Sequence, residues 1–142
     1  MYPNLDKGIE AVAALPAVDP DLLKKSKVEA VEQPFLSASD IHSDGGTGPD
    51  GTFCLQGWAC KKFGGKLKND YTVKGSAALF IVGLLDEAAK AFAESQPGYG
   101  ELPYRGWDKG IGFIVAYPLR EHPEVSAEIW NLTMRRIGVG TS

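Results

Sequence analysis

Apolar residues recur at helical spacing in several segments of the chain, most clearly in residues 77–94. The apolar stripe of this segment consists of Phe80, Ile81, Leu84, Leu85, Ala88 and Phe92. Small residues and Val82 extend the apolar surface beyond one face, so the pattern predicts a central helix. Ser76 stands at the expected N-cap position, and Pro97-Gly98 follows as a stop signal.

Two short helices are predicted near the start of the chain. Asn4 can cap the first, which has an apolar face from Leu5 to Val12 and is stopped by Pro16. Asp19 followed by Pro20 is the start signal of the second, because Pro is favoured at the first helical position. Both segments carry few bulky side chains.

Further helices are predicted at 52–64, with Thr52 as N-cap and a Gly-Gly stop, and from His122-Pro123 to Gly138. Residues 110–119 fit either a buried strand or a short helix capped by Asp108, and the helix is favoured. Residues 66–75 fit a small hairpin or an ordered loop.

Together these patterns predict a mainly α protein. It would be a compact bundle of about five helices with Gly/Pro-rich loops and room for one small β-hairpin. Residues 1–42 are predicted to form a helical N-terminal arm or peripheral layer, and residues 43–142 the main helical domain. Between them, residues 43–51 contain four Gly and one Pro, which predicts a loop.

Composition narrows the possible classes of protein. The chain has 142 residues, is 44% hydrophobic and has a net charge of −3, which argues against a duplex-DNA binder with a basic face. No apolar run reaches the roughly 18–20 residues of a membrane span. The first residues lack the apolar core of a secretory signal, and two cysteines cannot form a disulfide scaffold. We therefore expect a cytoplasmic protein with no membrane association.

An aromatic-rich loop at residues 97–110 is the first candidate binding site. Its side chains Tyr99, Tyr104, Arg105 and Trp107 belong to the residue types that dominate binding hot spots. The segment is interspersed with Gly and Pro, as expected of a loop that presents a patch to a partner. The alternative is that Trp107 and one Tyr fold back as a lid on the core.

Five lysines form a second candidate site: Lys61, Lys62, Lys66, Lys68 and Lys74. Only Asp70 offsets them, so the rest of the chain is strongly acidic. Such a local excess of positive charge could bind phosphate, single-stranded nucleic acid or an acidic partner. Phe63 and Tyr71 lie nearby as possible stacking groups. The alternative is a solvated helix end, where lysines are favoured by the helix dipole.

Cys54 is the one candidate nucleophile. A thiol in the first turn of a helix has a lowered pKa, and His122 or His42 would have to serve as the base. His122 precedes a proline at a helix start, where a capping role is the commoner one, and we favour Cys54 as a small buried hydrophobe. No phosphate-binding loop, nucleophile elbow or zinc-protease motif occurs, and we expect no metal or cofactor.

The segment Phe53-Cys54-Leu55-Gln56-Gly57-Trp58 resembles the helix start of a group of small helical proteins from phages and their bacterial hosts. In that group an aromatic-Cys-x-x-Gly helix follows a polar loop and precedes a leucine-rich helix and a final amphipathic helix. The corresponding parts here are residues 76–94 and 123–137. The resemblance implies a small helical protein of phage or accessory-genome type and implies no activity.

From these features we expect a non-catalytic interaction module that binds a protein partner or self-associates. Its binding residues would be those of the 97–110 loop. Two alternatives stay open: a hydrolase that uses Cys54 with His122 or His42, and a nucleotide- or anion-binding protein that uses residues 61–74.

Overall fold

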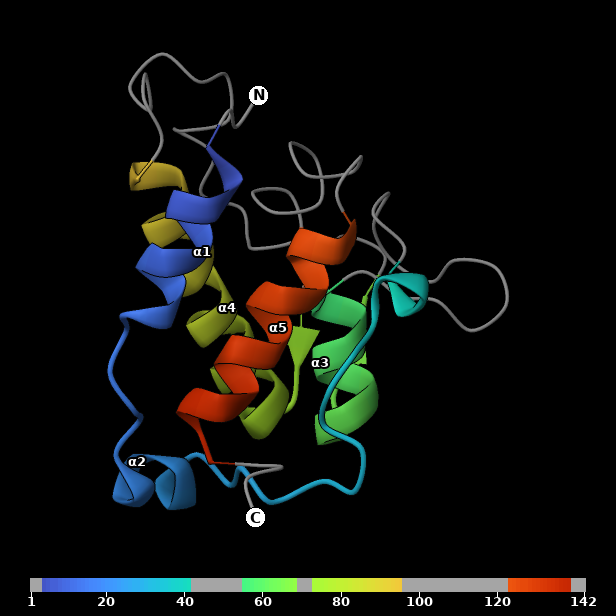
Figure 1. Ribbon diagram of the computed structural model, residues 1–142. Coiled ribbons are helices and arrows are strands. Elements are labelled where there is room, and N and C mark those ends of the chain that lie inside the picture. Colours follow the sequence, from blue (N-terminus) through green and yellow to red (C-terminus); the bar gives the residue numbers. More distant parts are fainter. Residues whose placement is uncertain (1–3, 42–54, 69–72, 96–122, 139–142) are drawn as a thin grey trace.

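The computed structural model describes residues 4–41, 55–68, 73–95 and 123–138. The elements in chain order are α1 (Leu5–Ala13), α2 (Pro20–Lys25), the 3-10 turn η1 (Ala38–Asp40), α3 (Leu55–Phe63), β1 (Lys66–Leu67), β2 (Val73–Lys74), α4 (Ser76–Glu94) and α5 (Pro123–Arg136) (Figure 1). This arrangement confirms the predicted mainly α fold with one small hairpin. None of the described helices is long and apolar enough to cross a membrane.

Helix α4 is the centre of the packing, as its wide apolar stripe predicted. It contacts α1, α3 and α5, and Figure 1 shows it behind α1 and α5. Ile81, Leu85 and Ala88 have no exposed surface. Since burying one large apolar side chain stabilises a fold by about 1.5–3 kcal/mol, this helix contributes much of the hydrophobic driving force.

The start of α4 differs from the sequence prediction. Ser76 is the first residue of the helix rather than its cap, and the N-cap is Gly75, which makes no side-chain hydrogen bond. Gly75 has a φ of 116°, a conformation that favours glycine. A Cβ there would lie 3.0 Å from the Cα of Gly65. The tight passage from β2 into α4 therefore selects glycine over a capping side chain.

The other predicted helix boundaries are set by local chemistry. The Asn4 side chain accepts a hydrogen bond from the backbone N–H of Lys7, and Asp19 caps α2 in the same way through Asp21. Helix α3 ends before Gly64, which has a φ of 75°, and Gly138 follows α5 with a φ of 81°. The predicted cap Thr52 lies outside the described residues, as does the segment 108–119.

Helix α1 packs closely on α4 because Gly8 has no side chain. Gly8 faces the ring of Phe92, which is 1% exposed. Val12 of α1 and Leu36 belong to the same hydrophobic cluster as the core residues of α4 and α5. The N-terminal segment thus contributes side chains to the main core, and the division of the chain at residue 42 stays a prediction.

The core face of α5 is formed by large apolar side chains at helical spacing. Val125, Ile129 and Met134 are buried, and Leu132 is partly buried. Trp130 has no exposed surface and is the largest fully buried side chain among the described residues.

Two glycine substitutions test the packing of α1 on α4. In Gly8→Ala, the new Cβ would lie 2.2–2.7 Å from three atoms of the Phe92 ring, and we expect a loss of about 1–3 kcal/mol in unfolding free energy. Gly83, exposed in the middle of α4, has open space around it. Gly83→Ala should therefore stabilise the protein by roughly 0.5–1 kcal/mol through helix propensity. Urea denaturation measures both, and equal shifts in the two variants would contradict the close approach.

Candidate functional site

The structure describes only part of the predicted site residues. The proposed binding residues Tyr99, Tyr104, Arg105 and Trp107 lie outside the described segments, and so do Cys54, His42 and His122. The five lysines of the second candidate site are all described. The site is therefore built from α3, the hairpin and the chain segment that faces them.

The hairpin presents two lysines directly opposite each other. Strands β1 and β2 are antiparallel, and Lys66 pairs with Lys74 while Leu67 pairs with Val73. Since paired side chains point to the same face, Lys66 and Lys74 share the outer face. Leu67 and Val73 take the inner face, where they pack with Cys60 of α3 and Ala78 of α4. The hairpin is thus amphipathic, with an apolar inner face and a basic outer face.

Two more exposed lysines lie near the hairpin. Lys68 follows β1 at the alternating position of Lys66, and Lys61 lies on α3, which contacts both strands. We call Lys61, Lys66, Lys68 and Lys74 the lysine surface. Within the described residues, none of the four makes a hydrogen bond or ion pair through its side chain. Like charges placed directly opposite destabilise a strand pair, so an anion bound here would relieve the repulsion.

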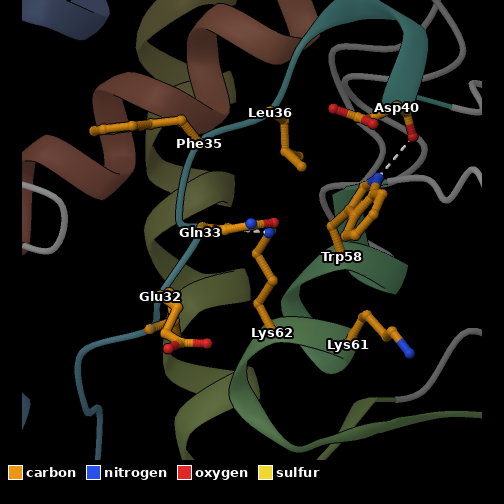
Figure 2. Close-up of a pocket in the computed structure, with 9 residues that line it drawn as sticks. Glu32, Gln33, Phe35, Leu36, Asp40, Trp58, Lys61 and Lys62 are labelled. Carbon is orange, nitrogen blue, oxygen red and sulfur yellow. Dashed lines mark hydrogen bonds between the residues drawn. The ribbon is translucent and has the colours of Figure 1, made fainter.

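Lys62 lies apart from the other four lysines. Its Nζ donates a hydrogen bond to the backbone oxygen of Gln33 and lies 5.1 Å from the centre of the Trp58 ring. Burial lowers the pKa of the Lys62 ammonium group, and the nearby Asp40 carboxylate opposes part of this shift. Figure 2 shows Lys62 reaching from α3 to Gln33 while Lys61 points away. Lys62 connects α3 to the 31–40 segment instead of adding to the lysine surface.

Side chains of α5 hold the 31–40 segment on its other side. The indole Nε1 of Trp130 donates to the Pro34 oxygen at 2.6 Å. The Asn131 amide makes two hydrogen bonds to Leu36, accepting from its N–H at 2.8 Å and donating to its oxygen at 2.9 Å. No strand of the described sheet pairs with this segment, so helix side chains supply the partners that buried backbone groups require.

Trp58 of α3 supplies a further connection. Its indole Nε1 donates to the Asp40 oxygen at 2.7 Å, drawn as a dashed line in Figure 2. Trp58 is partly buried and packs at the edge of the main hydrophobic cluster. Its hydrogen bond fixes the orientation of the ring, and the Lys62 ammonium group lies over the ring.

A groove lies between the 31–40 segment and α3. It has a volume of about 550 Å³, within the usual range for small-ligand sites. One side consists of Trp58, Lys61 and Lys62 of α3, and the other of Val31, Glu32, Gln33, Phe35, Leu36 and Asp40. The Asp40 carboxylate already accepts hydrogen bonds from the N–H and hydroxyl of Ser37. Glu32 is exposed and has no partner within the described residues.

Sequence reasoning missed the role of Trp130 and Asn131. One signal was available: Asn is a poor helix former that tends to bond to backbone groups, and Asn131 stands next to the only Trp of the last predicted helix. Its partner Leu36 lies 95 residues away, which no local pattern reveals.

No protein-family model matches the chain, and searches of curated proteins and of solved structures also give no match. The function is therefore argued from this chain's own residues. Among the described residues, His, Cys, Asp and Glu form no group of three or more that could hold a metal ion.

Asn131→Ala tests how the groove wall is held. The substitution removes both hydrogen bonds to Leu36 and leaves its buried N–H without a partner, which should cost about 1–3 kcal/mol of unfolding free energy. Glu128→Ala is the control, because Glu128 is an exposed residue of the same helix and should change stability by less than about 0.5 kcal/mol. Denaturant midpoints that shift equally in the two variants would contradict the anchoring role.

Proposed function

We propose that this chain is a non-catalytic interaction module that binds an anionic partner through the lysine surface. The observation that carries the proposal is the direct opposition of Lys66 and Lys74 on the hairpin. Lys61 and Lys68 add to this charge, and none of the four is neutralised within the described residues. A two-stranded hairpin that places like charges face to face gives up stability, which a bound polyanion would restore.

Because the chain as a whole is negatively charged, a polyanion is attracted to the lysine surface and not to the rest of the protein. The chain carries −3 overall, so most of the protein repels a polyanion and the lysine surface attracts it. Such asymmetry orients the encounter and speeds association at low salt. The Phe53–Trp58 resemblance supports the further proposal that the module is encoded by a phage or an accessory genome.

The other expected functions remain predictions. Binding of a protein partner or self-association through Tyr99, Tyr104, Arg105 and Trp107 rests on residues that the structure does not describe. The same holds for a hydrolase that would use Cys54 with His122 or His42. The lysine surface is the candidate site whose arrangement is described, and it favours the anion-binding alternative.

A charge-reversal pair tests the proposal. We expect the double variant Lys66→Glu and Lys74→Glu to bind labelled polyanions at least about tenfold more weakly, because reversed charge replaces attraction with repulsion. The probes are oligothymidylate and polyglutamate of matched charge, followed by fluorescence anisotropy. Binding by the native protein should weaken steeply with added salt.

The matched control is Lys24→Glu with Lys25→Glu. These exposed lysines lie in the last turn of α2, and their reversal changes net charge by the same amount. It should alter affinity by no more than about threefold, the scale of long-range screened charge effects. Equal weakening by both pairs, or no binding of either probe to the native protein, would refute the proposed function.

A further inference from the structure

We propose that Lys66 and Lys74 together bind one phosphate monoester group, and that this group is a phosphorylated side chain of a protein partner. The inference rests on the proposed function, because it names the anionic group that this part of the lysine surface binds. It adds a preference for one doubly charged group over singly charged ones, which an excess of positive charge alone does not provide.

The register of the hairpin brings the two lysines together. Lys66 and Lys74 are direct partners across the antiparallel strands, so their Cβ atoms lie about 4.5–5.5 Å apart on the same face. Each ammonium group stands at the end of a flexible four-carbon stem, and both residues are exposed. The two ammonium groups can therefore converge on the oxygens of a single bound group.

The backbone that carries the two lysines is closely packed. A Cβ on Gly65 would lie 2.4 Å from the Cβ of Ala78 in α4 and 2.6 Å from the backbone oxygen of Lys74. The chain next to Lys66 is thus in contact with both β2 and α4, and the apolar inner face of the hairpin packs on α3 and α4. The positions of the two lysine Cα atoms are therefore set before a partner binds, which reduces the entropy lost on binding.

Both charges are available to a ligand. Neither lysine makes a hydrogen bond or ion pair through its side chain within the described residues, and the first turn of α4, which follows Lys74, contains no acidic residue. A phosphate monoester carries a charge of about −1.5 to −2 at pH 7 and three acceptor oxygens, so one such group balances both lysines. A carboxylate or a phosphodiester carries a single charge and leaves one lysine unbalanced.

Lys68 favours a protein segment over a nucleic acid as the source of the phosphate. It is exposed and follows Lys66 by two residues, or about 7 Å along an extended chain. Side chains on one face of an extended peptide repeat at the same interval, so a carboxylate two residues from the phosphorylated one can lie beside Lys68. The interior phosphates of a nucleic acid are diesters with one charge each, and a strand offers a monoester only at its end.

Three peptides that differ in a single residue test the inference. They carry phosphotyrosine, sulfotyrosine or unmodified tyrosine, each with a glutamate two residues away, and binding is followed by fluorescence anisotropy. A sulfate ester has the shape of a phosphate ester but only one charge. At pH 7 we expect the native protein to bind the phosphopeptide at least about threefold more tightly than the sulfopeptide, the scale of one additional exposed ion pair. Equal affinity for the two esters would overturn the inference.

The second ionisation of the phosphate supplies a pH readout. Its pKa is about 6, so the doubly charged form accumulates as the pH rises from about 5 to about 7. Affinity for the phosphopeptide should rise at least about threefold over this range, whereas affinity for the sulfopeptide should not rise. Because the protein's own groups titrate in the same way with either peptide, the sulfopeptide corrects for them. The same pH dependence for both esters would contradict binding of the doubly charged form.

Single substitutions test whether the two lysines act as a pair. Lys74→Ala should reduce the preference for phosphopeptide over sulfopeptide to less than about twofold, because one remaining lysine balances either ester equally well. Lys68→Ala is the matched control, and it should weaken binding of both peptides while keeping the preference. Circular dichroism confirms that each variant is folded. A preference that survives Lys74→Ala, or that Lys68→Ala removes to the same extent, would show that no pair site exists.

Oligothymidylate with and without a 5′-phosphate tests the other source of the group. A 5′-phosphate that raises affinity more than phosphorylation of the peptide does would assign the site to a nucleic acid and overturn the inference. If the two esters bind equally and the Lys66 and Lys74 reversal weakens both, the anion-binding function stands and the phosphate site is wrong. If no polyanion binds to the native protein, both proposals are wrong.

Discussion

The structure depends on the way in which α3 and α5 hold residues 31–40, a segment that has no partner strand in the described sheet. Four side chains donate to its backbone: Lys62 to Gln33, Trp130 to Pro34, Asn131 to Leu36 and Trp58 to Asp40. Each of these bonds contributes only about 0.5–1.5 kcal/mol net, but a buried backbone group left without a partner costs more. These donors therefore hold the segment in position together with the packing of Leu36 in the main hydrophobic cluster.

This constraint links the core to the candidate site. Trp130 is both a core residue with no exposed surface and a hydrogen-bond donor to Pro34, so the packing of α5 on α4 also positions one wall of the groove. On the opposite wall, Trp58 packs at the edge of the same core cluster. The groove thus lies between α3 and the 31–40 segment that α5 holds, and the hairpin that carries Lys66 and Lys74 packs against α3 and α4 through its apolar face.

Local chemistry explains which parts of the fold could be predicted. The caps at Asn4 and Asp19 and the stripe of α4 depend on neighbouring residues only, and the sequence was sufficient for them. Ser76 was misassigned because the bend at Gly75 depends on contact with Gly65, which belongs to another turn. The lysines were recognised as a cluster. Four of them are exposed, whereas Lys62 donates a hydrogen bond to Gln33. The sequence could not separate Lys62 from the others, because Gln33 is distant along the chain.

Amide hydrogen exchange at Leu36 tests most directly whether helix side chains hold the extended segment. Its N–H is bonded to Asn131 and the residue is 6% exposed, so we expect the amide to be protected to nearly the same degree as the core amides of Ile81 and Leu85. Exchange of Leu36 at the rate of an unprotected amide, with Ile81 and Leu85 still protected, would show that the segment is not held by α5 and would contradict this account of the groove.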